Sequence, residues 1–314
     1  MKAVFLDRGT FLDSIELPAP DGITDYITYD GTAQDNELII QRCQDADIII
    51  TNKVKIDQDI IQNLPKLKLI QLTATGTNNV DKEACKKQNI TLFNVAGYAV
   101  KSVPEHTLML MLSALRATRH YHQKASDGSW QQNGNFCLLD IPLIDLEDKT
   151  LGIIGVGTIG KRVSEIAHAF GMQVLWAEHQ GRQPRSQAYT AFDEVLQHSD
   201  VISLHCPLTS DTQHLINADT LAKMHKKPLL VNVARGGVVD SQAVVDAIND
   251  GQLLGYATDV FEQEPIANND PLLRISEHPR VIFSPHNAWG SLSAQQTLWQ
   301  ILSKQVSEFI AQYQ

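Results

Sequence analysis

Four residues with acid–base or anion-binding side chains each follow a short apolar run in the last third of the chain. They are Arg235, Asp259, Glu264 and His286. A guanidinium can bind a carboxylate through two parallel hydrogen bonds, and an imidazole beside a carboxylate can exchange a proton near neutral pH. Taken one at a time, each side chain also has an ordinary structural interpretation. The arginine could be an exposed turn residue, the two acids could be solvated in loops, and the histidine could be a hydrogen-bonded packing residue. Because all four follow strand-like runs, a shared site at one sheet edge is favoured.

A G-x-G-x-x-G pattern lies between another apolar run and a stretch of helical period. Gly155 would allow a tight turn, Gly157 would let the backbone approach a pyrophosphate, and Gly160 would let helix and strand pack closely. The N–H groups that begin the helix, at Thr158 and Ile159, would hold the anion. The pattern predicts a dinucleotide site, although glycines of this spacing also occur in simple turns.

Glu178 ends the next apolar run, about 20 residues after the glycines, where a dinucleotide site carries an acid. A carboxylate there accepts the ribose hydroxyls of NAD and repels the 2′-phosphate of NADP. Arg182 and Arg185 follow closely and could admit that phosphate. NAD is therefore the predicted cofactor and NADP the less favoured one, while a solvated glutamate is the structural alternative.

A nicotinamide cofactor gives the strand-end residues consistent roles. Reducing a ketone by hydride transfer requires a proton donor at the developing alkoxide and positive charge near the carbonyl. His286 paired with Glu264 would be the acid/base, and Arg235 would anchor and polarise the substrate.

Strand and helix patterns alternate along almost all of the 314 residues. The predicted strands are 3–6, 47–51, 67–72, 90–93, 151–155, 173–178, 201–206, 229–234, 254–260 and 281–284. The predicted helices include 35–43, 57–63, 82–87, 161–170 and one from 292 to the end. This alternation favours an α/β protein with parallel sheets covered on both faces, and the length favours two domains.

Another helix is predicted after Lys101, with Ser102 and Glu105 forming a capping box at its start. The chain then turns polar, and residues 116–141 are predicted to form an arm on the surface.

Composition excludes several other classes of protein. The formal net charge is −10 and no Lys/Arg cluster is present, which disfavours nucleic-acid binding. No apolar stretch reaches the ~20 residues of a membrane span, and the first apolar run is too short for a signal peptide, so we expect a cytoplasmic protein. The four cysteines lack zinc-ligand spacing, so no metal site is predicted.

At these motifs the sequence closely resembles the D-isomer-specific 2-hydroxyacid dehydrogenase family. The similar segments are 155–160, 201–207, 232–240, 256–265 and 284–290, with further similarity at 75–81 and 94–107. The similarity therefore spans nearly the whole chain, in several separate motifs that occur in the right order.

The resemblance implies two Rossmann-like or flavodoxin-like doubly wound domains, joined by long helices, with the active site in the cleft between them. Residues 1–100 with 291–314 would form the substrate domain, and residues 101–290 the NAD-binding domain. It also implies a homodimer through the arm, and an NAD-dependent enzyme that interconverts a small 2-oxo acid and its D-2-hydroxy acid.

The resemblance also assigns roles to particular residues. Arg235, Glu264 and His286 would be the catalytic trio, with Asp259 near the nicotinamide. The other residues along the cofactor would be Cys206, Pro207, Val233 and Ala234, with Arg235 and His286 also facing it. The substrate carboxylate would be bound by Arg235 and by the backbone N–H groups of Ala74, Thr75 and Gly76.

Segments 136–143 and 286–289 resemble the glycerate dehydrogenase (hydroxypyruvate reductase) branch, which favours hydroxypyruvate/glycerate or glyoxylate/glycolate as substrates. Three residues depart from the family pattern: Glu178 replaces Asp, Pro104 replaces Ala, and Asn78 replaces Asp. Formate dehydrogenase relatives carry Gln where this chain has Glu264, which argues against that chemistry. The alternative function is a non-catalytic, NAD-sensing interaction protein similar to the corepressors of the family.

Overall fold

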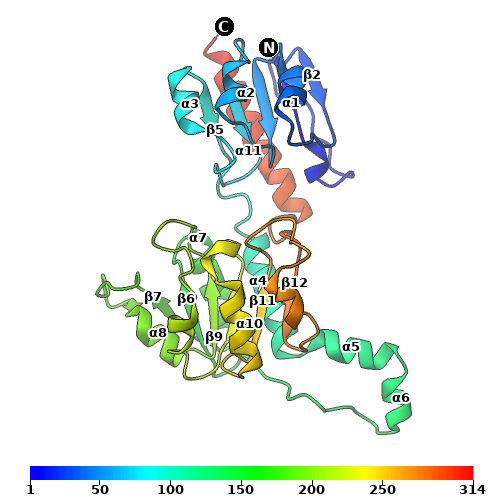
Figure 1. Cartoon of the computed structure of the whole chain (residues 1–314), viewed down its shortest axis with the longest axis vertical. Coiled ribbons are helices and arrows are strands. Elements are labelled where there is room, and N and C mark those ends of the chain that lie inside the picture. The colour runs from blue at the N-terminus through cyan, green and yellow to red at the C-terminus, as the bar shows by residue number, and fades with distance from the viewer. Residues whose placement is uncertain (314) are drawn as a thin grey trace. The chain divides into compact units, whose positions relative to one another are not determined.

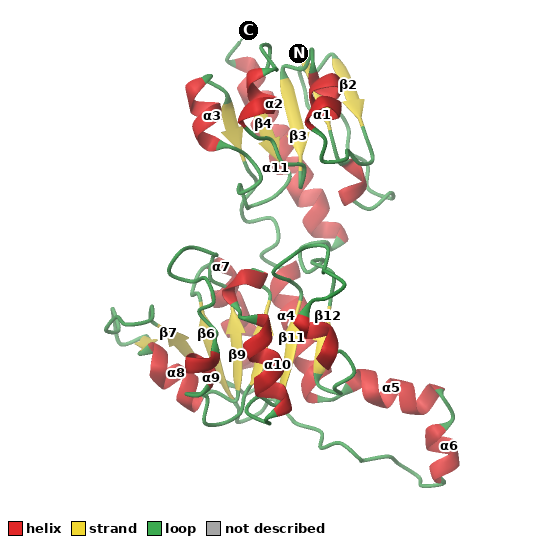
Figure 2. Cartoon of the chain, viewed as in Figure 1, coloured by secondary structure: helices red, strands yellow, loops and turns green. Residues whose placement is uncertain are grey.

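The computed structural model describes residues 1–313 and contains two compact units (Figure 1). Unit 1 consists of Met1–Ala99 and the chain from Trp289 onwards, and unit 2 consists of Val100–Ala288. Each unit is a parallel sheet with helices packed on it (Figure 2). The α/β class and the doubly wound sheets expected from the sequence are confirmed.

The sheet of unit 1 has the strand order β2-β1-β3-β4-β5, with every neighbouring pair parallel. Its strands are β1 (Lys2–Phe5), β2 (Asp25–Thr28), β3 (Ile48–Thr51), β4 (Leu69–Leu72) and β5 (Thr91–Phe93). This is the order of flavodoxin-like folds. The sequence predicted all of these strands except β2, which is a half-exposed edge strand without an apolar run.

Helices cover both faces of this sheet. They are α1 (Asn36–Cys43), α2 (Gln58–Gln62) and α3 (Lys82–Lys87) on one face and α11 (Leu292–Ala311) on the other, with the 3-10 turn η1 (Arg8–Thr10) after β1. Successive side chains of β3 point to opposite faces of the sheet: Ile49 packs under α1–α3, whereas Ile48 and Ile50 pack under α11. Both faces are apolar and must therefore be covered by helices.

The sheet of unit 2 has the order β12-β11-β10-β9-β6-β7-β8, and it is also parallel throughout. Its strands are β6 (Thr150–Ile154), β7 (Gln173–Ala177), β8 (Tyr189–Thr190), β9 (Val201–Leu204), β10 (Leu229–Asn232), β11 (Gly255–Thr258) and β12 (Val281–Phe283). The order reverses at β6, as in Rossmann folds, and ligands bind at such a switch point. Only the two-residue β8 was not predicted.

Helices also cover both faces of the unit 2 sheet. They are α4 (Ser102–Leu115) and α7 (Thr158–Ala169) on one face and α8 (Phe192–His198), α9 (Ala218–Leu221) and α10 (Ser241–Asn249) on the other, with the 3-10 turns η2 (Gly236–Val238) and η3 (Pro271–Ile275). Leu230 packs against α8–α10, and its neighbours Leu229 and Val231 pack against α4 and α7.

The expected capping box at the start of α4 is wrong. Ser102 is the first helical residue rather than the N-cap, and Lys101 at the cap makes no side-chain cap bond. The Ser102 hydroxyl instead donates to the Ala288 carbonyl oxygen at 2.5 Å. The hydroxyl therefore donates to a distant carbonyl instead of accepting from an N–H of its own helix, and this bond ties α4 to the segment that follows β12.

The arm predicted for residues 116–141 contains α5 (Thr118–Ser126) and α6 (Ser129–Asn133), followed by an extended return (Figure 1). The Tyr121 hydroxyl of α5 donates to the carbonyl oxygen of Ile141 at 2.6 Å, so the return is hydrogen-bonded to the outgoing helix.

Arg280 ties the root of the arm to the sheet. Its side chain is buried, and its guanidinium donates to the carbonyl oxygens of Ala114 (3.0 Å), Leu115 (2.7 Å) and Pro142. The first two carbonyls lie at the end of α4, where Ala114 also accepts from the Ala117 N–H and Leu115 from the Ile144 N–H, so Arg280 adds a charged donor to each. Arg280 therefore joins the helix end and the returning arm.

Replacing Arg280 tests this role. Arg280→Met should lower the free energy of unfolding by about 3 kcal/mol, because three carbonyls lose a charge-assisted hydrogen bond from a buried guanidinium. Urea denaturation measures the change. Arg274→Met removes an exposed arginine and should cost less than about 0.5 kcal/mol. Equal losses in the two variants would contradict the role assigned to Arg280.

His205, just after β9, is a partly buried residue whose ring carries a buried nitrogen. Its Nε2 pairs with the Ser203 hydroxyl at 2.9 Å, and its buried Nδ1 has no hydrogen-bond partner within the described chain. Burial lowers the pKa of His205 to about 3. The folded protein therefore keeps this ring neutral at pH values where the unfolded chain protonates it.

The free energy of unfolding should consequently fall as the pH drops below about 6.5, and His205 should account for about 2 kcal/mol of the loss between pH 7 and pH 5. The sign follows because the unfolded state binds more protons in this range. His205→Gln should flatten the profile measured by urea denaturation, whereas the exposed-residue control His225→Gln should keep the wild-type slope. A profile that stays unchanged in His205→Gln would refute this account.

Candidate active site

The register of the unit 2 sheet places four loops at one edge. Leu204 of β9 is level with Asn232 of β10, which is level with Thr258 of β11, which is level with Phe283 of β12. Because the strands are parallel, the loops that follow them emerge on the same side. The predicted strand-end residues Cys206, Arg235, Asp259 and His286 all lie in these loops.

His286 and Glu264 form the predicted pair. The Nδ1 atom of His286 lies 2.5 Å from the Oε2 atom of Glu264, and Oε1 of Glu264 accepts a hydrogen bond from the Phe261 backbone N–H at 3.0 Å. The side chains are 24% and 32% exposed, so the imidazole is partly shielded and still reachable by a small molecule. A carboxylate on Nδ1 fixes the ring orientation and leaves Nε2 to exchange a proton.

The loop that carries His286 is held by the buried carboxylate of Asp259. His286 has a φ of +51°, in the left-handed region that costs a residue with a side chain roughly 1–2 kcal/mol. Asp259 accepts hydrogen bonds from the backbone N–H groups of Asn287 (3.0 Å) and Ala288 (2.9 Å) and from the Ser284 hydroxyl (2.6 Å). These bonds keep the loop in its strained conformation. Asp259 thus supports the catalytic loop, in addition to any contact with the cofactor.

Two residues that sequence reasoning missed extend this network. Nε2 of His106 lies 2.9 Å from the Ser284 hydroxyl and 3.5 Å from Oδ1 of Asp259. Burial lowers the pKa of His106, while the nearby Asp259 charge raises it, and the net shift is downward. Because Ser284 donates to Asp259, a neutral His106 completes the chain by donating from Nε2. The only sequence signal was a histidine one turn into an otherwise apolar helix.

Arg235 lies in a turn shaped by its neighbours. The side chain of Asn232 accepts from the Ala234 N–H at 3.0 Å and donates to the Arg235 carbonyl oxygen at 3.0 Å. A Cβ on Gly236 would come within 1.9 Å of the Phe261 carbonyl carbon, so this backbone lies directly on the loop that leads to Glu264. The Arg235 side chain is exposed, with Nη1 donating to the Ala234 carbonyl oxygen at 2.7 Å.

The glycine loop fits a dinucleotide. Gly155 has a φ of +99°, and a Cβ there would lie 2.4 Å from the backbone nitrogen of Cys206. A Cβ on Gly160 would lie 2.3 Å from the Gly155 carbonyl oxygen, which explains the close approach of helix and strand. A Cβ on Gly157 would meet nothing within 4 Å, so open space faces the loop just before α7 begins at Thr158. A pyrophosphate could therefore reach the free N–H groups of the first helical turn.

Cys206 and Pro207 follow β9, and Val233 and Ala234 follow β10, beside this loop. Burial raises the pKa of the Cys206 thiol to about 11, so it is a neutral, apolar lining group rather than a nucleophile. Their contact with a cofactor stays a prediction.

Glu178 directly follows β7 and its side chain is only 2% exposed. Its carboxylate accepts from Nε (2.7 Å), Nη2 (2.5 Å) and the backbone N–H (3.0 Å) of Arg185, and from the backbone N–H of His179 (2.8 Å). Nδ1 of His179 also lies 2.8 Å from it. The Arg185 hydrogen bonds and those of His179 hold the pKa of Glu178 well below its usual range. The structure thus shows an acid engaged by its own loop, which the sequence did not predict.

The predicted carboxylate-binding turn lies in unit 1, just after β4. The Ala74 carbonyl oxygen accepts from Val95 N–H at 3.0 Å, and the Thr75 carbonyl oxygen accepts from the Asn94 side chain at 2.8 Å. Within residues 1–313, the backbone N–H groups of Ala74, Thr75 and Gly76 have no protein acceptor. Three successive free donors of this kind can bind an anion.

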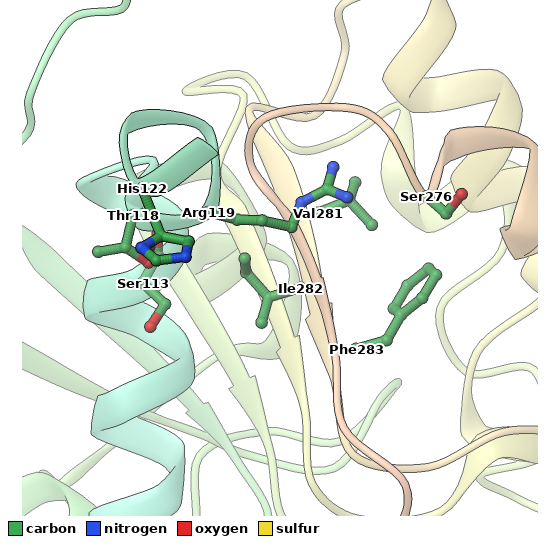
Figure 3. A pocket seen from close by; sticks show the side chains of 8 residues that line it. All are labelled: Ser113, Thr118, Arg119, His122, Ser276, Val281, Ile282 and Phe283. Carbon is green, nitrogen blue, oxygen red and sulfur yellow. Dashed lines mark hydrogen bonds between the residues drawn. The ribbon is translucent and has the colours of Figure 1, made fainter. Parts of the chain in front are cut away.

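A hollow elsewhere in unit 2 lies beside the edge strand β12 (Figure 3). It is lined by Ser113, Thr118, Arg119, His122, Ser276, Val281, Ile282 and Phe283. Its lining includes no predicted site residue, and it lies at the root of the arm.

Metal-binding clusters and membrane-spanning helices are both absent from residues 1–313. No three His, Cys, Asp or Glu side chains there are grouped so that they could hold a metal ion. No helix in this part of the chain is long and apolar enough to cross a membrane.

Comparison with known proteins identifies the family. The family model described as D-isomer specific 2-hydroxyacid dehydrogenase, NAD binding domain, matches residues 108–288. The chain is 40% identical to the glycerate dehydrogenase of Methylorubrum extorquens, covering 99% of this chain and 96% of the relative. It is 34% identical to the hydroxypyruvate reductase of Blautia hydrogenotrophica, covering 99% and 97%.

A solved structure agrees with these sequence relatives. The D-lactate dehydrogenase of Aquifex aeolicus, complexed with NAD and lactic acid, has a TM-score of 0.80 and 27% identity, covering 99% of this chain and 96% of that one. The fold class and the family resemblance inferred from the sequence are both confirmed. The chain belongs to the D-isomer specific 2-hydroxyacid dehydrogenase family.

Proposed function

We propose that the protein is an NAD(H)-dependent enzyme that interconverts hydroxypyruvate and D-glycerate, with glyoxylate and glycolate as the second substrate pair. The observation that carries the proposal is the His286–Glu264 pair, which lies at the sheet edge that also bears the glycine loop. The proposed substrate pair is supported by the two full-length relatives named for it, since glycerate oxidised at C2 is hydroxypyruvate.

In this proposal the cofactor supplies the hydride to C2 of the 2-oxo acid, and the chain supplies the rest. His286, protonated on Nε2, gives its proton to the C2 oxygen, and Glu264 stabilises the imidazolium through Nδ1. In the reverse direction the neutral ring takes the hydroxyl proton. Arg235 holds the substrate carboxylate and polarises the carbonyl, and the N–H groups of Ala74–Gly76 contribute further donors.

The full-length relatives named as a dehydrogenase and a reductase support an enzyme over the non-catalytic NAD-sensing protein, and the acid–base pair is consistent with that function. A sensor needs to bind the dinucleotide but needs no proton donor. In this chain the loop carrying His286 is kept in a strained conformation by three hydrogen bonds to Asp259. Strain of this kind is typical of sites that position a reacting group.

The arm supports a homodimer. Phe136 and Leu139, on its returning segment, are 96% and 70% exposed, and Trp130 in α6 is 41% exposed. Large apolar side chains gathered on one projecting segment are typical of interaction surfaces. We propose that a second copy of the chain covers them, with the hollow beside β12 in the same interface (Figure 3). A cytoplasmic location remains part of the proposal.

The catalytic assignment predicts a specific loss in His286→Gln. Turnover of hydroxypyruvate, followed by NADH absorbance, should fall about 10²–10⁴-fold because the proton donor is removed. NADH binding, measured by calorimetry, should persist. His225→Gln, an exposed histidine elsewhere in unit 2, should match wild type. If His286→Gln turns over hydroxypyruvate, glyoxylate and pyruvate as fast as wild type, the assignment is wrong.

The dimer predicts an effect of charge on the arm. Phe136→Asp with Leu139→Asp should convert a particle of twice the chain mass into a monomer in sedimentation experiments, because charges would be buried in the interface. An exposed apolar residue of unit 2 outside the arm, Leu208, provides the control as Leu208→Asp. A wild-type protein that sediments as a monomer at all concentrations would refute the dimer.

A further inference from the structure

Glu178 is placed where the acid of an NAD site accepts the ribose hydroxyls, yet its acceptor capacity is already used. Oε1 accepts from the His179 backbone N–H and from Nη2 of Arg185, and Oε2 accepts from Nε and the backbone N–H of Arg185. A carboxylate offers about four lone-pair sites. With four donors bound to it and 2% exposure, this carboxylate has no site left for two ribose hydroxyls.

The same contacts cancel the charge that normally repels NADP. Arg185 binds the carboxylate in the two-bond geometry of a fork, and charge-assisted bonds of this kind are the strong ones. The loop beyond carries a further exposed arginine, Arg182, and a His179 side chain that is 63% exposed. A 2′-phosphate arriving at the end of β7 would therefore meet a neutralised acid within a basic loop.

The guanidinium of Arg185 is also positioned to bind a second anion. Its Nε and Nη2 face Glu178, and its guanidinium carbon lies 4.6 Å from the centre of the Tyr189 ring, so the group is held in place from two sides. Nη1 has no acceptor within residues 1–313, and the side chain is 50% exposed. A guanidinium fixed in this way loses little freedom when it binds a phosphate.

We propose that Arg185 rather than Glu178 meets the adenosine ribose, and that the site therefore accepts NADP(H) as well as NAD(H). Nη1 donates to the 2′-hydroxyl of NAD or to the 2′-phosphate of NADP, and Glu178 acts by orienting Arg185. Arg185 is then the specificity-determining residue for the cofactor. This inference rests on the proposed dinucleotide-binding role of the glycine loop.

Direct binding tests the proposal without using activity. Calorimetric titration should give the wild-type protein dissociation constants for NADPH and NADH within about tenfold of each other. Arg185→Gln should weaken NADPH binding at least about tenfold while NADH binding changes much less, because only the phosphate needs the charge. Added salt should weaken NADPH more than NADH in wild type, and this difference should vanish in the variant.

The variant Glu178→Gln distinguishes this proposal from the alternative in which the Glu178 carboxylate itself repels the 2′-phosphate. If a bare carboxylate excluded NADPH, removing its charge would tighten NADPH binding by orders of magnitude. Because Arg185 already neutralises that charge, we expect a change below about tenfold. Arg274→Gln removes an exposed charge on η3, beside the opposite end of the same sheet, and should leave both affinities unchanged.

The outcomes separate a failure of the proposed function from a failure of the role assigned to Arg185. Wild-type protein that binds neither cofactor would refute the proposed function itself. Tight NADH binding with NADPH rejected about a thousandfold, or equal weakening of both cofactors in Arg185→Gln, would refute only the role of Arg185. A larger NADPH loss in Arg182→Gln than in Arg185→Gln would do the same. Should Arg185→Gln fail to fold, the wild-type ratio and Glu178→Gln still decide.

Discussion

The buried carboxylate of Asp259 is the interaction on which the candidate active site depends. It is 1% exposed, and its two oxygens hold two backbone N–H groups and one hydroxyl of the loop that follows β12. Without these bonds nothing in the local sequence favours a left-handed His286, since a residue with a Cβ avoids that conformation. The position of His286 therefore depends on a carboxylate that directly follows the neighbouring strand, and the parallel register of β11 and β12 brings the two together.

Three carboxylates near this sheet edge share one chemistry and differ in their partners. Asp259 is bonded to backbone and hydroxyl donors, so it serves as a structural anchor. Glu264 is bonded to the imidazole of His286, so it orients that ring. Glu178 is bonded to the guanidinium of Arg185, so its charge is hidden from any ligand. The partner, rather than the acid, determines what each carboxylate does for the enzyme.

Glycine and arginine have complementary uses in this unit. Gly155, Gly160 and Gly236 stand where another backbone passes too closely for any Cβ, so they set how tightly the loops of the sheet edge pack together. Arg280, at the opposite edge of the sheet, donates to carbonyls of a helix end and of the returning arm and so joins the two. Close packing of the loops that follow the strands thus holds the site side chains, while hydrogen-bonded backbone groups hold the opposite edge of the same sheet.

Much of this organisation was readable from the sequence, because it depends on local patterns. Buried strands appear as apolar runs, helices as a period of 3.6, and the phosphate loop as spaced glycines, so nearly all elements and the strand-end residues were predicted. The edge strands β2 and β8 were missed because they are partly exposed and carry no apolar run.

What the tertiary structure alone decided was the choice of hydrogen-bond partner. Ser102 bonds the distant Ala288 rather than its own helix, and His106 joins Ser284 and Asp259 from a separate element. The Arg185 fork on Glu178 likewise appears only once the loop after β7 has folded back. The sequence by itself thus determined which elements form and which residues lie at their ends. Side-chain pairing was left to the fold, because a hydrogen bond depends on distance and angle in space and not on separation along the chain.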